Sequence, residues 1–402
     1  MKPARRLPLL GTMLTGSLSV FAITLLAMAL PWVLISGGHG TMVAGAAAFC
    51  LHMPAVIGTA LGGRLIDRAG ARRVLLLGDA GGLLAVLGAA LLAEVPGMGL
   101  WPVVGMLALS NLAAAPGIVA QSARMPEIAR LAGIPLPAAN AWSDVAMGIS
   151  YVAGPATAVL LVEAGGLPLV LQAAASILAL VCLVGLATFP RFARRRRGPP
   201  SGASGRPARD PALAVLLALG IALVGIYASL DEILAPALVV AEGVAADRLA
   251  LFLGILGATS LGSSLLFALV GHRLSRRRTF ASGVVLFAAG LWALALLPAG
   301  IGLLLGPALI GVGAGPLSPI MVTAIQERVP AAARGHVLGR VRAMIMAAQP
   351  LAALAAGPAV AVLGPARFAL ALALAASAAA AVSALHPGMR RIDARSGPSV
   401  PP

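Results

Sequence analysis

Two adjacent acids inside a long apolar stretch have the clearest capacity for chemistry in this 402-residue sequence. Asp231 and Glu232 stand five and four residues before Pro236. Ionisable side chains within a membrane segment are costly and mark ion or substrate pathways. Neighbouring residues of a helix point about 100° apart, so only one of the two acids needs to face a cavity. We interpret them as candidates for proton coupling or cation binding, the alternative being two hydrated groups at the outer interface.

Four further polar side chains lie within apolar stretches: His52, Asn111, Gln172 and Gln349. An imidazole could pass protons, and the three amides could hydrogen-bond a substrate. The alternative is that these groups make hydrogen bonds between packed helices, as polar side chains in membrane helices commonly do. Both interpretations stay open from the sequence.

The sequence lacks the residues that several other kinds of chemistry require. Lys2 is the only lysine, which rules out the phosphate-binding loop G-x-x-x-x-G-K-[ST]. The sequence contains neither H-E-x-x-H nor G-x-S-x-G, and its two cysteines lie inside apolar stretches. We therefore expect no catalytic residues, no metal and no cofactor, and we predict that the protein is not an enzyme.

The elements that must position these residues are membrane helices. Of the residues, 60% are hydrophobic and only 10% charged, too few to coat a soluble protein, and the mean hydropathy is +0.99. A helix spans the bilayer with about 20 apolar residues, and the sequence has twelve such stretches. They are 9–35, 42–65, 74–93, 99–122, 138–162, 167–189, 212–240, 249–271, 279–298, 301–325, 339–363 and 366–386. The predicted fold class is an all-α membrane protein with 12 transmembrane helices.

Basic residues test this count. With a cytoplasmic N-terminus, 27 of the 29 lysines and arginines fall in cytoplasmic segments, and only Arg248 and Arg367 fall outside. Positive residues are retained on the cytoplasmic side, so this alternation favours twelve helices with both termini inside. It also explains the net charge of +16 without nucleic acid. We expect a multi-pass protein of the cell inner membrane whose first helix is retained, because its apolar run is too long for a signal peptide.

The chain is predicted to consist of two bundles. Residues 1–190 and 212–388 each hold six helices, 191–211 form a basic cytoplasmic linker, and 389–402 form a disordered tail. Short motifs recur between the halves at offsets of 203 to 209, including Gly154-Pro155 and Gly357-Pro358. Duplicated six-helix halves are typical of alternating-access carriers. Prolines free backbone groups and permit helix bends, here at Gly154, Pro155, Pro236, Gly357 and Pro358.

The loop predicted after the second helix resembles the signature of the major facilitator superfamily, G-x-L-x-D-R-x-G-x-R-R. Its residues here are Gly63, Leu65, Asp67, Arg68, Gly70, Arg72 and Arg73. The resemblance implies the major facilitator fold with two pseudo-symmetric halves. It also implies a cytoplasmic gate in which Asp67 contacts the start of the eleventh helix near Gly339; the alternative is a solvated acid paired with Arg68 or Arg72.

A second resemblance is to the branch of macrolide-efflux and enterobactin exporters. It rests on Met125-Pro126-Glu127, Asn140-Ala141, Gly154-Pro155-Ala156 and Gln326-Glu327-Arg328-Val329-Pro330. This similarity implies export of small amphipathic molecules, driven by proton antiport. The family's antiporter motif ends Gly-Pro-x-x-Gly-Gly, whereas this sequence continues after Gly154-Pro155 as Ala156-Thr157-Ala158, which leaves the coupling ion open.

The leading hypothesis is thus a monomeric secondary active exporter in the lipid bilayer, with a small-molecule substrate and protons as the candidate coupling ion. The second hypothesis is an importer of a small nutrient or anion. A non-transporting membrane protein or a membrane-embedded enzyme is the remote alternative.

Overall fold

The computed structural model describes residues 7–190, 211–329 and 331–390, and within these ranges the regular structure is helical. Apart from their ends, helices satisfy their backbone hydrogen bonds within their own segment, which an apolar solvent requires. In the first half of the chain the helices are α1 (Leu7–Ser36), α2 (Thr41–Ala69), α3 (Ala71–Ala93), α4 (Leu100–Ala132) and α5 (Leu136–Thr188). In the second half they are α6 (Pro211–Ser229), the π-helix η2 (Leu230–Leu234), α7 (Ala235–Ala241), α8 (Asp247–Val270), the 3₁₀ turn η3 (Gly271–Arg273), α9 (Arg276–Leu296), α10 (Ala299–Ala314), α11 (Leu317–Arg328), α12 (Ala331–Leu363), α13 (Pro365–Leu385) and α14 (Pro387–Arg390).

The helix count agrees with the sequence prediction once one break is considered. Eleven helical runs of the described residues are long and apolar enough to cross a membrane. The longest, 138–188, has non-helical backbone at Gly165 and at Gly166, where φ is 67° and ψ −168°. That combination is open essentially to glycine alone, so the chain turns there and the run consists of two spans. Twelve membrane helices result, six in each half.

Two predicted helices are longer than their apolar stretches. Helix α4 continues to Ala132 rather than 122, and α12 begins at Ala331 rather than 339. Hydropathy marks only the part of a helix that lies in hydrocarbon, whereas backbone hydrogen bonds continue along polar residues such as Arg124 and Arg130.

The chain divides into two compact units, the first built from α1 to α5 with residues 243–250 and 353–358, and the second from the rest of α6 to α14. The linker predicted at 191–211 and the tail predicted at 389–402 lie almost wholly outside the described residues. The proposed domain bounds therefore stay predictions.

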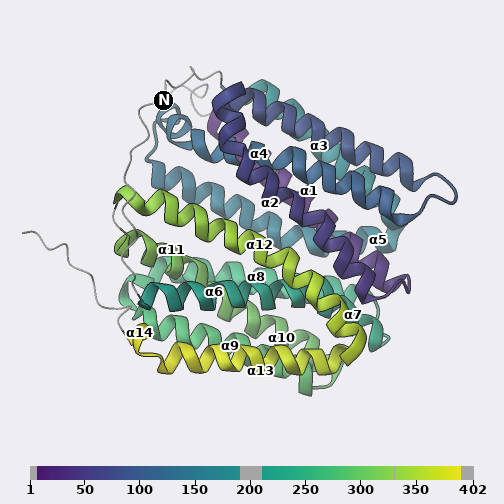
Figure 1. Ribbon diagram of the computed structural model, residues 1–402, viewed down its shortest axis with the longest axis vertical. Coiled ribbons are helices and arrows are strands. Elements are labelled where there is room, and N and C mark those ends of the chain that lie inside the picture. Colours follow the sequence, from purple (N-terminus) through teal and green to yellow (C-terminus); the bar gives the residue numbers. More distant parts are fainter. Residues whose placement is uncertain (1–6, 191–210, 330, 391–402) are drawn as a thin grey trace, which may run out of the picture. The chain divides into compact units, whose positions relative to one another are not determined.

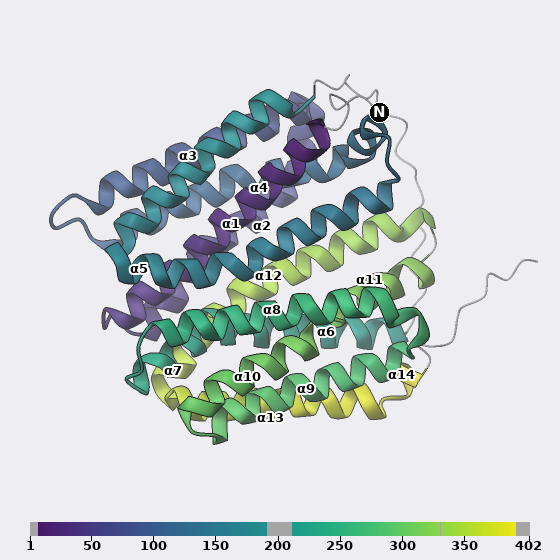
Figure 2. The same cartoon turned by 180° about the vertical axis from the view of Figure 1, so that it is seen from behind.

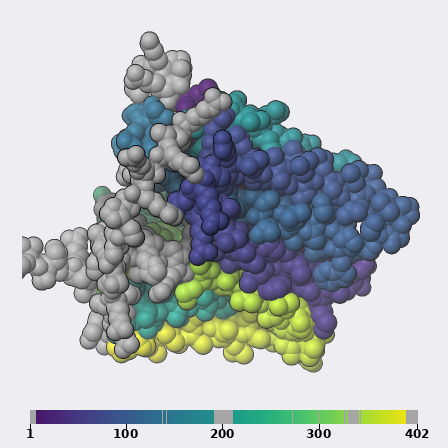
Figure 3. All heavy atoms as spheres, turned by 45° about the horizontal axis from the view of Figure 1, so that its top comes forward, coloured from purple at the N-terminus to yellow at the C-terminus, as the bar shows by residue number. Residues whose placement is uncertain are grey.

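Within the first unit, α1 packs along α5, and α4 packs against both α2 and α3 (Figure 1). Small residues permit these close approaches. A Cβ atom added at Gly58 of α2 would lie 2.7 Å from the carbonyl O of Leu112, and one added at Gly78 of α3 would lie 2.6 Å from that of Ala113. In the space-filling view of Figure 3, α3 and α4 form one continuous surface in indigo and blue.

The second unit repeats this packing. Helix α9 lies against α10 and α13 (Figure 2). A Cβ atom at Gly283 of α9 would lie 2.7 Å from the carbonyl O of Gly313 on α10. On the other side of α9, Trp292 Nε1 donates a hydrogen bond to Ser377 Oγ of α13 (3.0 Å). The glycine contact between α3 and α4 is thus repeated between α9 and α10.

Candidate functional site

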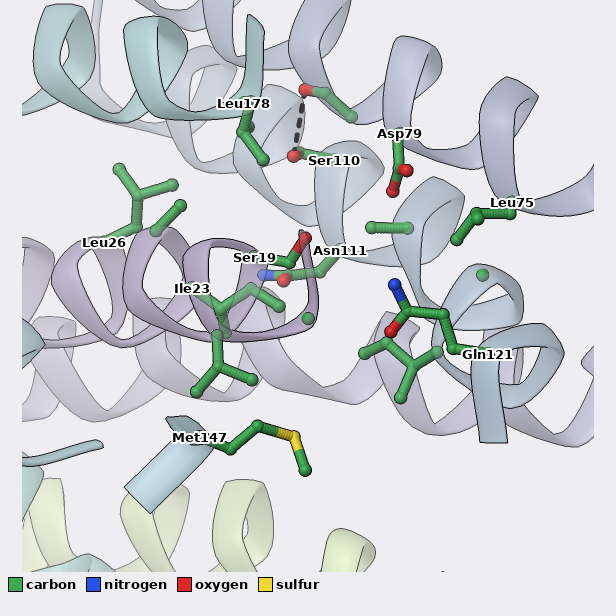
Figure 4. A pocket seen from close by; sticks show the side chains of 17 residues that line it. Ser19, Ile23, Leu26, Leu75, Asp79, Ser110, Asn111, Gln121, Met147 and Leu178 are labelled. Carbon is green, nitrogen blue, oxygen red and sulfur yellow. Dashed lines mark hydrogen bonds between the residues drawn. The ribbon is translucent and has the colours of Figure 1, made fainter. Parts of the chain in front are cut away.

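A small cavity lies inside the first unit, between α1, α3, α4 and α5 (Figure 4). Its volume is about 40 Å³, room for a few water molecules or an ion but far below the several hundred Å³ of a typical drug-sized pocket. The walls are mainly apolar side chains and glycines. The polar residues that line it are Ser19, Asp79, Ser110, Asn111 and Gln121.

Asp79 is the ionisable residue of this cavity. It is the ninth residue of α3, about 12 Å along the helix from its start. The residue is 6% exposed, and its Oδ2 atom has no hydrogen-bond partner among the residues that the structure describes. Figure 4 shows the carboxyl group directed toward the same space as Asn111 and Gln121. A charged carboxylate in such a place costs on the order of several kcal/mol unless something neutralises it.

The neutral polar side chains around Asp79 bind the helices to one another. Ser110 Oγ donates to the carbonyl O of Gly82 on α3 (3.0 Å), and Asn111 Nδ2 donates to that of Leu51 on α2 (3.0 Å). Gln121 Nε2 donates to Thr15 Oγ1 on α1 (2.9 Å). Three side chains of α4 therefore reach three different helices, which places α4 at the centre of this unit.

The cavity contains one residue that the sequence analysis selected and one that it missed. Asn111 lines it and also makes the interhelical hydrogen bond that was the alternative interpretation. His52 is half-buried on α2 and Gln172 is exposed on α5, and neither lines the cavity. Asp79 was overlooked although it stands inside the apolar stretch 74–93. The rule that selected Asp231 and Glu232, an acid within a membrane span, would have found it.

In the second unit the structure brings two predicted residues together. Gln349 Nε2 on α12 donates to Glu232 Oε1 on η2 over 2.7 Å. Glu232 is 3% exposed, whereas its neighbour Asp231 is half-buried. Of the two adjacent acids, Glu232 is therefore the one directed into the unit.

Glu232 and Asp231 lie on a π-helical turn, which the sequence did not predict. Within η2 the backbone N–H of Ala235 bonds to the carbonyl O of Leu230, five residues earlier. Pro236 follows directly; it cannot donate to the carbonyl of Glu232, and its ring would crowd that carbonyl in a regular α-helix. A π turn contains one residue more than an α turn, and this wider turn avoids the clash between the proline ring and the carbonyl group. Single π turns are frequent at functional sites because they change the direction of side chains.

The segment that resembles the superfamily signature is mostly helical, which corrects the prediction of a loop. Helix α2 continues through Asp67 and Arg68 to Ala69, and α3 begins at Ala71. The connection is Gly70 alone, with φ 86° and ψ 146°, a conformation that a residue with a Cβ rarely adopts. Gly63, Asp67, Arg68 and Arg73 are exposed. The predicted partner of Asp67, the start of α12 near Gly339, has side chains outside the described residues, so the gate role stays a prediction.

The guanidinium group of Arg72 caps the C-terminus of another helix. Its Nε donates to the carbonyl O of Phe189 (3.0 Å) and its Nη2 to that of Leu186 (2.9 Å), at the C-terminus of α5. The last carbonyls of a helix lack partners within it, and a cation there also opposes the helix dipole. Arg277 does the same in the second unit, where its Nη2 donates to the carbonyl O of Ala384 in α13 (2.6 Å). Each is the second residue of its helix, α3 or α9.

Of the predicted bends, that in the first unit has visible consequences. Pro155 lies within α5, and a Cβ at Gly154 would overlap the hydroxyl group of Thr24 on α1. Thr24 Oγ1 also donates to the carbonyl O of Ser150 (3.3 Å), one turn before the proline. Gly357 and Pro358 lie within α12. Whether these positions move stays a prediction.

The residues of the second resemblance are only partly described. Arg124 Nη1 contacts both carboxylate oxygens of Glu127 at 3.0 Å, within α4. The side chains of Gln326, Glu327, Arg340 and Arg342 lie outside the described residues.

Twelve apolar helices in two six-helix halves, with a buried carboxyl group in each half, define a polytopic membrane protein of the transporter class. Residues 12–339 match the Major Facilitator Superfamily, and the chain belongs to this family of membrane transporters. The resemblance stated from the signature residues is thereby confirmed.

Known proteins of similar sequence and structure agree with this assignment. The chain is 25% identical to the multidrug efflux pump Tap of Mycolicibacterium fortuitum, over 92% of this chain and 93% of that protein. It is 28% identical to the multidrug efflux pump Tap of Mycobacterium tuberculosis H37Rv, over 91% and 90%. Among solved structures, the nucleoside transporter NupG has a TM-score of 0.71 at 16% identity, with 95% and 98% of the chains covered. The D-xylose-proton symporter has a TM-score of 0.71 at 16% identity, with 94% and 96% covered. These structural likenesses concern the fold.

Proposed function

We propose that the protein is a secondary active exporter of small amphipathic molecules. The observation on which this proposal rests is its similarity to multidrug efflux pumps along more than nine tenths of its length. The composition of the described spans supports it, because they hold few charged groups, whereas carriers of sugars or anions need several polar or basic groups at mid-helix. An importer of a nutrient or anion is the second candidate, since solved structures of the same fold include a nucleoside transporter and a sugar symporter.

The exporter works by alternating access between two six-helix bundles, residues 1–190 and 212–388, joined by the basic linker 191–211. It resides in the cell inner membrane as a monomer, with both termini in the cytoplasm, where the positive-inside rule retains 27 of the 29 basic residues. Asp67 and the residues around Gly70 form the cytoplasmic gate. The buried carboxyl groups support coupling to a cation gradient, with protons as the first candidate. The protein catalyses no reaction and requires no cofactor.

The proposal is tested by expression in a bacterial strain that lacks its own main drug exporters. Wild type is expected to raise the inhibitory concentration of several amphipathic drugs several-fold over the empty vector, and to lower ethidium accumulation in energised cells. A protonophore should restore accumulation. Asp67→Asn is expected to lose most of this effect at equal membrane abundance, because the gate needs the charge.

Glu94→Gln is the matched control, since Glu94 is an exposed acid that ends α3. It is expected to export like wild type. If no compound in the panel changes its inhibitory concentration or its accumulation in any variant, the export proposal is wrong. Uptake of a nutrient or anion by the same cells would favour the importer.

A further inference from the structure

We propose that the cavity around Asp79 is a binding site for one small monovalent cation, a sodium ion or a proton, located wholly within the first unit. The site deepens the proposed export function, on which its role in energy coupling rests. Asp79 was not among the residues that the sequence pointed to, and neither the family match nor the relatives assign it a role.

The burial of Asp79 requires a positive partner. The residue is 94% buried within a membrane helix, and its Oδ2 atom is unpaired among the described residues, at a cavity large enough for an ion. A bare carboxylate is very costly in such surroundings, and a proton or a bound cation removes the cost.

The charge of the site fits a single positive charge. Asp79 is the one carboxylate that lines the cavity; Ser19, Ser110, Asn111 and Gln121 are neutral. On the elements that pack against α3, the titratable group within electrostatic reach is Cys182 of α5, and the cavity-lining residues of α1 and α4 include none. No cluster of three histidine, cysteine or acidic side chains exists among the described residues. A divalent ion would therefore leave an excess positive charge in hydrocarbon, whereas a monovalent ion leaves none.

The donor atoms are oxygens. Ser110 donates its only hydroxyl hydrogen to the carbonyl O of Gly82. Toward a bound ligand its oxygen can therefore act only through its lone pairs. The amide nitrogen of Asn111 is directed to Leu51, which leaves its carbonyl oxygen for another partner. Carboxylate, hydroxyl and amide oxygens are the ligands that hard cations such as sodium prefer. A volume of about 40 Å³ accepts an ion with a little water and excludes an organic cation.

The position of the site explains how occupancy would affect transport. Its polar side chains come from α1, α3 and α4, so a bound cation joins three helices of one unit. When the cation leaves, the charge of Asp79 must be solvated in another way, and this requires the same helices to rearrange. A gradient of the cation can in this way bias the packing of the first unit, which is the kind of two-state element that coupling requires.

The experiment uses the full-length protein purified in detergent. Thermal unfolding is followed at several pH values in sodium chloride and in potassium chloride of equal ionic strength. A ligand that binds only the folded state raises the midpoint with the logarithm of its concentration. Sodium binding predicts a midpoint that rises with sodium but not with potassium, most strongly at high pH, where protons compete least. Proton binding predicts no sodium effect and a loss of stability at high pH that is specific to Asp79.

Asp79→Asn is expected to abolish whichever dependence wild type shows, and Glu94→Gln to keep it. If Asp79→Asn does not accumulate, Asp79→Glu and radioactive sodium binding to wild type replace it, with a weaker sodium effect expected for the longer acid. A wild type with neither sodium nor pH dependence, or a dependence that Asp79→Asn retains, overturns the proposal. Drug export is measured separately, so an exporter without this site and a cation site without drug export are distinguishable.

Discussion

The two acids that are buried in the described part of this transporter, Asp79 and Glu232, are accommodated by different means. Glu232 receives a hydrogen bond from Gln349 over 2.7 Å, within the second unit. Asp79 Oδ2 in the first unit has no hydrogen-bond donor among the residues that the structure describes, and it faces a small cavity instead. An acid with a fixed protein donor is part of the packing, whereas an acid beside a cavity can exchange its partner. A buried carboxyl group thus stabilises the packing of one half, whereas in the other half we propose that it responds to ions.

The bond between Gln349 and Glu232 can be measured by a double-mutant cycle. Gln349→Ala and Glu232→Ala are each expected to lower the free energy of unfolding, and the double variant to lower it by less than the sum. The expected coupling is about 1 kcal/mol, because side-chain hydrogen bonds between membrane helices are worth little on average. Thermal unfolding of the purified protein gives the four values.

Gln172→Ala is the control for this cycle, since Gln172 is an exposed amide of the first unit. It is expected to leave stability unchanged and to show no coupling with Glu232→Ala. Additive effects of Gln349→Ala and Glu232→Ala would contradict the bond.

For single residues, the sequence predicted which polar side chains matter better than it predicted their hydrogen-bond partners. Glu232 and Gln349 were each selected as polar groups in apolar stretches, but they are 117 positions apart and nothing in the sequence pairs them. The π turn before Pro236 decides which of the two adjacent acids, Asp231 or Glu232, points inward. Hydropathy does not detect such a turn. Asp79 could be predicted from the sequence, because it is an acid within an apolar stretch that is long enough to span the membrane.

Among the elements, the junction between α2 and α3 shows most clearly how one residue determines a turn. Two helices of 29 and 23 residues meet at Gly70, whose positive φ ends the first and starts the second. The sequence predicted a loop of several residues here, because arginines and an aspartate interrupt the apolar pattern. Polar residues do not end a helix, and the glycine does.

Two glycines of the signature segment should therefore respond oppositely to alanine. Gly70→Ala is expected to destabilise the protein by about 1–3 kcal/mol, since its φ of 86° is strained for any residue with a Cβ. Gly63→Ala lies within α2 with open space around it and should stabilise the helix by roughly 0.5–1 kcal/mol. Thermal unfolding of the two purified variants compares them.

Drug export by Gly63→Ala separates folding from gating. A variant that is stable but fails to export places Gly63 in the moving gate, as the family resemblance implies. Equal destabilisation by both substitutions would contradict the assignment of Gly70 as the only residue of the turn.

For the whole molecule, charge and hydropathy together predicted most of the architecture. Basic residues alternate with apolar stretches so regularly that twelve helices were expected, and twelve are found once α5 is divided at Gly166. The two-unit division could be anticipated from repeated motifs, although each match was short. The contacts that build each unit could not, because they depend on glycines such as Gly58 and Gly78 meeting particular carbonyl groups.

The proposed orientation predicts which positions are reachable from outside. In a protein with Cys50 and Cys182 replaced by alanine, His39→Cys in the exposed connection between α1 and α2 should react with an impermeant maleimide in right-side-out vesicles. Ser201→Cys in the linker should react only after the membrane is permeabilised. The parent without cysteines controls for background, and the reverse pattern would invert the topology.

Arg72 and Arg277 have a consequence for the ancestry of the chain. Both arginines join the third helix of their half to the carbonyl end of the sixth, by the same type of bond at the same helical position. A contact shared at equivalent positions is what two copies of one six-helix segment would retain, as in carriers that are built from repeated halves. The buried acids do not follow this correspondence, because Asp79 stands on the third helix of its half and Glu232 on the first.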